Sequence, residues 1–209
     1  MKLLKFLLSI CFLFFFLSSY AQTTINPRIG LNISHLSGKP SIGENESRTG
    51  FNIGFNLRFG DRFQFETGAH YATHGVGFND ARGKDTLDRA PMHFVKLPLL
   101  ANINIVNSEV FRLRVYGGWM NNFLLKVDNN SLLSKEDVNV YTGGIHFGTG
   151  LDLTGLTIDL SYEVGMMDFF KGNGLPLVLY PKNTQNNVLT LSVGDRKSTR
   201  LNSSHANIS

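Results

Sequence analysis

The sequence predicts an all-β protein, an eight-stranded antiparallel up-and-down transmembrane β-barrel, and two regularities support this prediction. First, eight segments alternate apolar and polar residues with a period of two, and the connections between them are long and short by turns. Second, every apolar strand face lacks Asp, Glu, Lys and Arg. A basic residue that faces lipid near the bilayer centre costs about 2–4 kcal/mol, so charge-free faces indicate a membrane wall. A soluble barrel of the lipocalin type would place its charges outside.

The clearest element is a hairpin over residues 49–72, which follows a first strand at 27–35. Its two arms alternate on either side of Gly60-Asp61, and Gly60 tolerates the positive φ angle that a tight turn requires. The hairpin therefore has one apolar face and one polar face. The apolar face carries Phe51, Ile53, Phe55, Leu57 and Phe59 on the first arm and Phe63, Phe65, Thr67, Ala69 and Tyr71 on the second.

Five further segments repeat this alternation in the rest of the chain. Each is bounded by a polar loop or by a short turn that contains Asn, Ser, Thr or Gly. The predicted strands after the hairpin are 92–105, 110–124, 138–153, 156–168 and 187–194, the long loops are 36–48, 73–91, 125–137 and 169–185, and the short turns are 60–61, 107–108 and 154–155.

Nine charged residues of the strands fall on the polar face. In a membrane barrel this face points inward, and an eight-stranded barrel has an interior just wide enough for its own side chains. We therefore expect five basic and four acidic groups to pair as a structural polar core, with a narrow solute path as the alternative. The predicted interior charge network comprises Arg28, Arg58, Glu66, Lys96, Arg112, Arg114, Asp152, Asp159 and Glu163.

Residues 1–21 are predicted to be a secretory signal peptide, because Lys2 and Lys5 precede an uncharged apolar run and a small-x-small cleavage site. Cys11, the only cysteine, lies in this segment, so a barrel at 22–194 would form neither a disulfide nor a thiolate metal site. That domain holds 15 basic and 15 acidic residues. This balance argues against a basic surface for nucleic acid.

Residues 94–100 (FVKLPLL) form the most specific motif of the chain, an aromatic-x-x-x-Pro-Leu-Leu strand. This strand, and the order of the segments over nearly all of 25–194, resemble the PorT-like outer-membrane β-barrel family of Bacteroidetes-type bacteria. Lys96 stands where the family pattern has an acid, and Ser161 stands where an Arg often precedes the Tyr. The resemblance implies an outer-membrane location and a rearranged inward charge pairing. The member that gives the family its name serves a secretion and gliding machinery. No individual residue of this chain indicates that role.

Residues 195–209 depart from the pattern of a barrel end. The family continues after Ser-x-Gly with aromatic-basic-Phe, whereas Gly194 is followed by Asp195-Arg196-Lys197 and then by STRLNSSHANIS, which looks like translated adapter or vector sequence. We expect 195–209 to be a foreign or disordered tail outside the barrel. A native polar periplasmic extension is the alternative.

Few residues point to a metal or to catalysis. His70 and His74 share strand parity, but two histidines without a third ligand make an incomplete metal site. A serine hydrolase would need a Ser/His pair at the barrel rim, and no G-x-S-x-G or other local signature is present. Such a pair within hydrogen-bond reach would favour an enzyme. The serines and histidines that could contribute to it are Ser34, His35, His93 and Ser161.

We therefore expect a barrel of the cell outer membrane with a structural or interaction role, no enzyme activity and no cofactor. The expected partners are outer-membrane lipid, the outer-membrane assembly machinery, and a surface or secretion-machinery protein that meets the outer loops, chiefly 73–91 and 169–185. The alternatives are a small outer-membrane enzyme that acts on lipid and a narrow solute pore.

Overall fold

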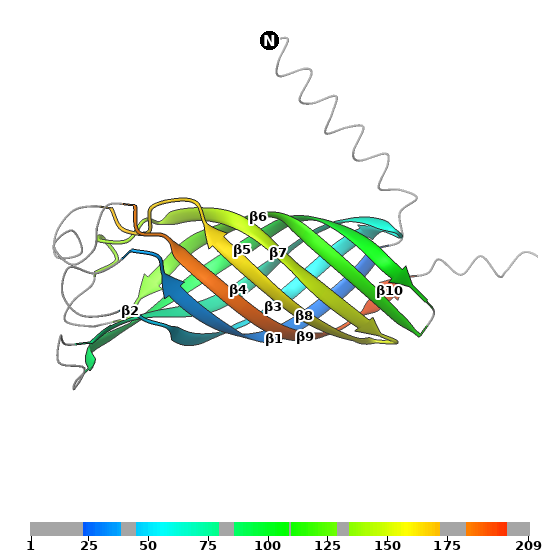
Figure 1. Cartoon of the computed structure of the whole chain (residues 1–209), viewed down its shortest axis with the longest axis horizontal. Helices are drawn as coiled ribbons and strands as arrows, with labels where there is room; N and C mark the ends of the chain where they lie inside the picture. The colour runs from blue at the N-terminus through cyan, green and yellow to red at the C-terminus, as the bar shows by residue number, and fades with distance from the viewer. Residues whose placement is uncertain are drawn as a thin grey trace, which may run out of the picture.

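The computed structural model describes residues 23–38, 45–79, 86–108, 110–128, 134–171 and 183–199, and the predicted signal peptide at 1–21 lies outside these ranges. Eight strands form a closed antiparallel barrel in the order β1-β3-β4-β5-β6-β7-β8-β9, and β9 pairs back onto β1 (Figure 1). The predicted eight-stranded up-and-down barrel is confirmed. Its strands are β1 (Thr23–Leu36), β3 (Arg48–Gly60), β4 (Phe63–Asn79), β5 (Thr86–Asn107), β6 (Phe111–Val127), β7 (Tyr141–Leu153), β8 (Leu156–Gly165) and β9 (Asn186–Asp195).

Two shorter strands add to the barrel at opposite ends. β2 (Asn45–Glu46) pairs with the far end of β4, and β10 (Lys197–Thr199) pairs with the first residues of β1. In Figure 1 their labels lie at the two ends of the long axis. We call the end with the short connections the turn end and the opposite end the loop end. Short turns of outer-membrane barrels face the periplasm, which predicts that the loop end faces outward.

The alternation in the sequence becomes a division between outside and inside. Ile29 and Leu31 are 54% and 66% exposed, whereas Asn26 and Asn32 on the same strand are 0% and 1% exposed. The apolar face therefore points outward, toward lipid, and the polar face points into the barrel. Across the described residues, no helix has the length and apolar character needed to cross a bilayer.

The tight connection between β3 and β4 forms as the sequence predicts. Gly60 has a φ of 117°, a conformation that L side chains rarely adopt, and the ladder resumes at once with Gly60 opposite Gln64. The β7–β8 turn uses Thr154 at a φ of 51°.

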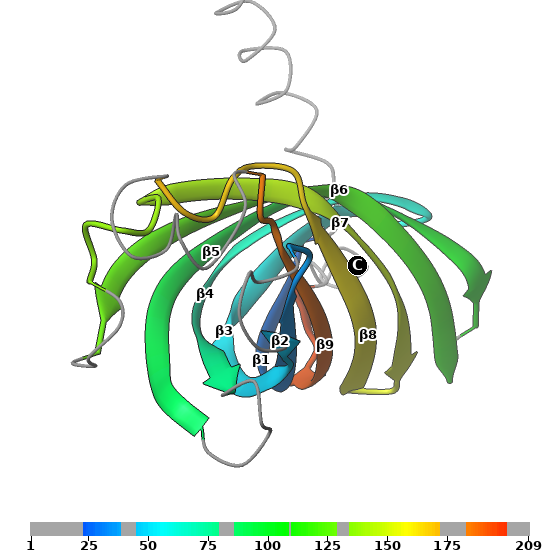
Figure 2. The same cartoon turned by 60° about the vertical axis from the view of Figure 1, so that its left-hand side comes forward.

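The loop predicted at 73–91 is largely wrong. β4 continues to Asn79 and β5 begins at Thr86, so most of this segment is a hairpin that extends past the other strands. Figure 2 shows its arms projecting at the loop end. The physical reason is that above the membrane the backbone N–H and C=O groups still need partners, and antiparallel pairing supplies them.

Two strand boundaries also move at the loop end. The strands predicted at 138–153 and 156–168 are shorter, because β7 begins at Tyr141 and β8 ends at Gly165. Val138 instead forms an isolated bridge with Phe170. The two loop segments pair with each other at this position and therefore leave the barrel wall early.

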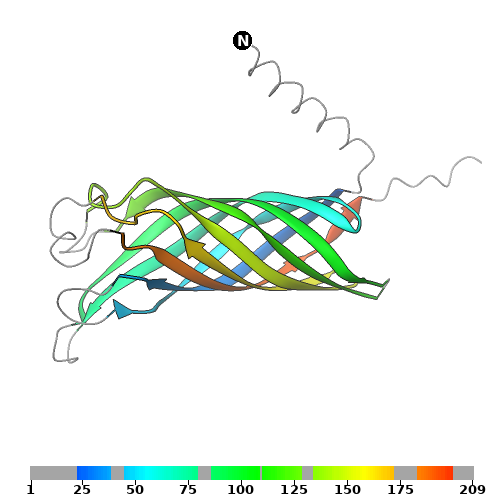
Figure 3. The same ribbon diagram turned by 45° about the horizontal axis from the view of Figure 1, so that its top comes forward.

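The chain does not leave the barrel at Asp195, contrary to our expectation for 195–209. β9 includes Asp195, and Lys197–Thr199 continue the ladder opposite Thr23–Ile25 (Figure 3). β1 begins before the point at which it pairs with β9, and a following segment of any sequence can pair with its first residues. The rest of 195–209 lies outside the described residues.

Candidate functional site: the filled barrel interior

The interior is built from side chains that the strand alternation directs inward. Arg58 on β3 lies opposite Glu66 on β4, while the next pair in the ladder, Phe59 and Phe65, belongs to the outward face. Arg58 and Glu66 are each 1% exposed. Charged groups buried so completely require partners, and the barrel supplies them.

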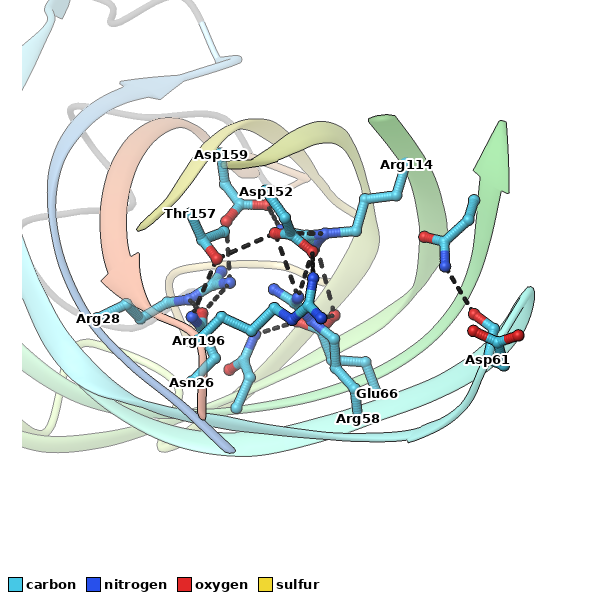
Figure 4. A network of polar contacts seen from close by, with 12 residues as sticks. Asn26, Arg28, Arg58, Asp61, Glu66, Arg114, Asp152, Thr157, Asp159 and Arg196 are labelled. Atoms are coloured by element: carbon cyan, nitrogen blue, oxygen red, sulfur yellow. Dashed lines mark hydrogen bonds and ion pairs between the residues drawn. The ribbon is translucent and has the colours of Figure 1, made fainter. Parts of the chain in front are cut away.

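Arg58 joins opposite walls of the barrel near its turn end. Its Nε donates to Glu66 Oε2 at 2.9 Å, and its Nη1 donates to Asp152 Oδ2 at 3.3 Å. Asp152 lies on β7, four strands away around the barrel, so the guanidinium bridges the interior (Figure 4).

A second arginine extends the same network. Arg114 on β6 donates to Asp159 on β8, and its Nε and Nη1 lie 3.6 Å from Asp152 Oδ1 and 3.9 Å from Glu66 Oε2. Asp159 Oδ2 also accepts a hydrogen bond from Arg28 Nη2 at 2.9 Å. Strands β1, β3, β4, β6, β7 and β8 are therefore tied together by one set of ion pairs (Figure 4).

A glycine makes room for this crossing. A Cβ at Gly150 would overlap both the Arg114 guanidinium and the Asp159 carboxylate. The absence of a side chain at this inward position of β7 therefore lets Arg114 pass to β8.

Toward the loop end a separate ion pair spans the interior. Lys96 Nζ on β5 lies 2.6 Å from Glu163 Oε2 on β8, and the second oxygen of Glu163 accepts from Asn122 Nδ2 at 2.6 Å. Lys96 and Glu163 are 6% and 2% exposed. The basic residue at the position where the resembled family has an acid thus has its own acidic partner.

Arg112 departs from the expected pairing. It lies opposite Asp152 in the ladder, yet within the described ranges it forms no ion pair. The Asp152 oxygens are already engaged by Arg58, Arg114 and the Thr157 hydroxyl, the last at 2.9 Å. Arg112 is only partly buried at the turn end, where water can solvate it.

Several members of the network were not anticipated from the sequence. Asn26 accepts from Arg28 at 2.8 Å and donates to Thr157 at 3.2 Å, and Asn56 contacts both Glu66 and His70. The inward parity of these asparagines was the available signal. Arg196 lies 3.7 Å from Asp152 and belongs to the segment expected outside the barrel (Figure 4).

Above the ion pairs the interior becomes apolar. Phe169 and Phe170 from the β8–β9 connection and Val138 from the β6–β7 connection pack inside the loop end. Backbone hydrogen bonds fix these segments, including Asn139 N to Phe169 O at 3.0 Å and Phe169 N to Thr184 O at 2.8 Å. The complete apolar cluster comprises Leu36, Met92, Phe94, Leu124, Val138, Phe169 and Phe170.

Two small cavities lie between the described side chains of the barrel interior. One cavity of about 40 Å³ is lined by Arg28, His70, Lys96, Tyr116 and Ser161, among others. A second, of about 10 Å³, lies between the apolar cluster and the Lys96–Glu163 pair. A water needs roughly 10–15 Å³, so the first cavity has room for a few waters and the second for about one.

The two histidines of shared parity both lie inside the barrel. His70 contacts Asn56, and the His74 ring packs 5.3 Å from the Phe94 ring. Among the described residues no three His, Cys, Asp or Glu side chains converge as a metal site would require.

The serines and histidines considered for catalysis are divided between inside and outside. Ser34 and Ser161 are buried in the interior, at 3% and 6% exposure. His35 points outward at the loop end, where its Nδ1 lies 3.3 Å from the hydroxyl of Ser47, a serine that was not considered from the sequence. His93 also lies on the outer wall, with Asp128 Oδ2 3.1 Å from its Nε2.

Comparison with solved structures shows the same fold at low sequence identity. Neisserial surface protein A is 12% identical with a TM-score of 0.50, and covers 82% of this chain and 96% of its own. OprG from Pseudomonas aeruginosa is 13% identical with a TM-score of 0.50, covering 85% and 96%. Ail, the attachment invasion locus protein of Yersinia pestis, is 16% identical with a TM-score of 0.45, covering 85% and 99%. No curated protein matches the sequence.

A protein family matches most of the chain. The outer membrane protein beta-barrel domain family matches residues 20–171, which include every barrel strand except β9. The closed barrel with a largely apolar outer wall agrees with this match. The chain therefore belongs to the outer membrane protein beta-barrel domain family, and the protein lies in the outer membrane.

Proposed function

We propose that this protein is a side-chain-filled barrel that acts through its extracellular face, in a structural or interaction role and not as an enzyme. The observation that supports this proposal is the projecting sheet of β2, β4 and β5 at the loop end. A barrel whose interior is occupied by ion pairs offers little room for a ligand, whereas a sheet that stands clear of the membrane offers a surface to other molecules.

The projecting sheet has a free edge. β5 pairs with β4 from Thr86 onward, but its pairing with β6 begins only at Met92. Residues 86–90 therefore have a neighbour on one side and no paired strand on the other within the described ranges, whereas the Pro91 carbonyl still accepts from Asp128 N at 2.9 Å. Unpaired N–H and C=O groups on a strand edge can accept an extended segment of a partner protein.

Shortening the hairpin tests this proposal. We expect a variant in which 77–89 are replaced by a two-residue Asn-Gly turn to assemble normally, because the barrel ladder below is unchanged. On intact cells, a photoreactive residue at Leu87 of the unchanged protein should crosslink to a surface protein, and the shortened variant, which lacks Leu87, should no longer retain that protein when it is purified. A photoreactive residue at Asp61, in a short turn, is the matched control. Equal crosslinking from Leu87 and Asp61 would refute the assignment of the binding surface.

Further partners follow from the fold and the resemblance. We propose that the outer-membrane assembly machinery inserts this barrel. The first and last strands must pair as the barrel enters the membrane, because an unpaired strand edge is not stable in hydrocarbon. The 94–100 motif supports a place among PorT-like barrels of Bacteroidetes-type bacteria, and with it a surface or secretion-machinery protein as the partner. Deletion of the gene should then reduce surface delivery of secreted proteins, and unchanged delivery would remove the secretion role.

A second candidate function is hydrolysis of a lipid, and one observation favours it. Ser47 and His35 are exposed on the outer wall at the loop end with 3.3 Å between Ser47 Oγ and His35 Nδ1. Within the described residues no carboxylate orients His35, which a serine nucleophile with a histidine base ordinarily requires. Ser47→Ala and His35→Ala should each leave lipid turnover in reconstituted vesicles unchanged. Loss of turnover in both would favour the enzyme.

A narrow solute pore is the remaining alternative. The two cavities, about 40 and 10 Å³, are separated by the Lys96–Glu163 pair. This arrangement favours an interior filled by side chains over a solute pore.

A further inference from the structure

Four side chains form a polar cluster on the lipid-facing wall at the loop end of β4, β5 and β6. We call Tyr71, His93, Lys126 and Asp128 the outer-rim cluster. They belong neither to the buried ion-pair network nor to the projecting sheet. A charged group that faces the hydrocarbon destabilises such a barrel, and this cost falls toward the interface. The position and contacts of these charged side chains therefore need a physical explanation.

A β-bulge places Lys126 in the cluster. The ladder between β5 and β6 pairs His93 with Lys126 and Phe94 with Leu124, so Leu125 is an extra residue without a partner. Strict alternation after Leu125 would point Lys126 into the barrel. The bulge instead leaves Leu125 and Lys126 both outward, at 46% and 69% exposure, and turns Val127 toward the interior apolar cluster.

The cluster is held by a continuous set of hydrogen bonds. Lys126 Nζ lies 2.6 Å from Asp128 Oδ1, and His93 Nε2 lies 3.1 Å from Asp128 Oδ2. The other ring nitrogen of His93 contacts the Tyr71 hydroxyl, and the two rings stack with centroids 5.8 Å apart. Side chains from three strands are thus fixed relative to one another.

These contacts leave the cluster with donors directed at solvent or headgroups. A carboxylate can only accept, and both oxygens of Asp128 are already engaged. The hydrogen bonds from Lys126 and then His93 hold the pKa of Asp128 below its ordinary value, so the carboxylate stays ionised near neutral pH. Lys126 has three N–H donors and uses one on Asp128, and its other two find no acceptor among the described side chains.

The level of the outer-rim cluster along the barrel axis indicates which kind of molecule lies next to it. Outward aromatic pairs lie beside it or just below it, with ring centroids 6.1 Å apart for Phe51 and Tyr71 and 5.2 Å apart for Phe123 and Tyr141. Aromatic girdles mark the interface between hydrocarbon and headgroups in such barrels. A molecule that approaches the wall at this level is a membrane lipid.

We propose that the outer-rim cluster binds the phosphate group of an outer-leaflet lipid. Lys126 forms the ion pair with the phosphate, and Asp128 and His93 are positioning residues that hold the ammonium against the wall. Because Asp128 spends both oxygens on these two donors, its negative charge opposes the phosphate less than a free carboxylate would.

Retention of a single lipid on the purified full chain tests the proposal. The protein is reconstituted with phosphatidic acid or with diacylglycerol, and bound lipid is counted by native mass spectrometry. We expect phosphatidic acid to be retained and diacylglycerol to be lost. Lys126→Ala should lower phosphatidic acid retention about fivefold, the size of one exposed ion pair, and added salt should produce a similar loss. Lys171→Ala removes an exposed lysine of the β8–β9 connection, which is not part of the outer-rim cluster, and should change nothing.

Two further variants and one competitor decide the outcome. Asp128→Asn should weaken retention if Asp128 positions Lys126, and stronger retention would overturn that role. Lys126→Arg should keep most of the binding. Heat-modifiable migration confirms that each variant is folded. If Lys126→Ala retains phosphatidic acid like the unchanged protein, or if inorganic phosphate competes as well as the lipid does, the lipid-phosphate site is refuted.

Discussion

Neighbouring residues of one strand in this barrel lie in opposite environments. Leu160 is 49% exposed to the lipid side of β8, whereas Ser161 is 6% exposed and lines the interior cavity. The two positions differ by one residue and by a change of solvent from hydrocarbon to a polar, hydrated core.

Arginine substitutions at these two positions should therefore differ. Leu160→Arg should prevent membrane assembly, because a guanidinium facing lipid near the bilayer centre costs about 2–4 kcal/mol. Ser161→Arg should be milder, because Asp159 and Glu163 lie on the same face of β8. Folded protein is measured by heat-modifiable gel migration after reconstitution. Equal damage would show that the two faces are wrongly assigned.

Breaking one buried ion pair should cost more than removing it completely. Lys96→Met leaves Glu163 buried with only Asn122 as a partner, and we expect it to lower the free energy of unfolding by about 3–5 kcal/mol. Lys96→Met combined with Glu163→Gln should recover most of that loss, because no unpaired charge remains. Urea unfolding from lipid vesicles gives both values. A double variant as unstable as the single one would mean that the pair does not act as a unit.

At the scale of elements, the loop end differs from the turn end in how its strands finish. At the turn end, a φ of 117° at Gly60 closes β3 onto β4 within a few residues. At the loop end, β4 and β5 run on together to Asn79 and Thr86, and the β6–β7 and β8–β9 connections fold into the mouth. The turn end is therefore compact, whereas the loop end carries the projecting hairpin and the infolded connections.

This difference predicts which connection is reachable from outside the cell. A peptide tag inserted between Asn79 and Thr86 should be labelled by antibody on intact cells, because long connections of such barrels face outward. A tag between Gly60 and Asp61 should be labelled only after the outer membrane is opened. The opposite labelling pattern would invert the proposed topology.

At the scale of the whole molecule, the barrel is closed laterally by strand pairing and filled internally by two kinds of contact. Ion pairs occupy the turn end and the middle, and an apolar cluster occupies the loop end. These layers leave cavities of about 40 and 10 Å³. The interior of an eight-stranded barrel is just wide enough for its own side chains to fill it.

The filled interior predicts that the protein does not conduct ions. Planar bilayers containing it should show no stable current steps. Phe94→Ala combined with Phe169→Ala removes much of the apolar cluster and should also stay closed, because the Arg58–Asp152 bridge still spans the turn end. Steady single-channel steps from the unchanged protein would favour the solute pore instead.

The sequence by itself determined the barrel, its strand number and its two faces. Period-two alternation is a local property, and a face without charge over Phe51, Ile53 and Phe55 has one stable environment in this context, which is lipid. The same parity assigned Arg58 and Glu66 to one face before any contact was known. The Gly60 turn was equally local, because it depends on one φ angle.

Only the tertiary structure decided which inward groups meet and where strand parity changes. Arg58 reaches Asp152, 94 residues away in the sequence, because the closure of the barrel sets those strands opposite one another. Arg112 has no ion pair among the described residues for the same non-local reason, since other groups occupy its neighbour Asp152. The bulge at Leu125, which sends Lys126 outward, depends on how β5 and β6 are registered by the whole sheet. Alternation fixes the face on which a side chain lies, whereas barrel register and closure fix its partner.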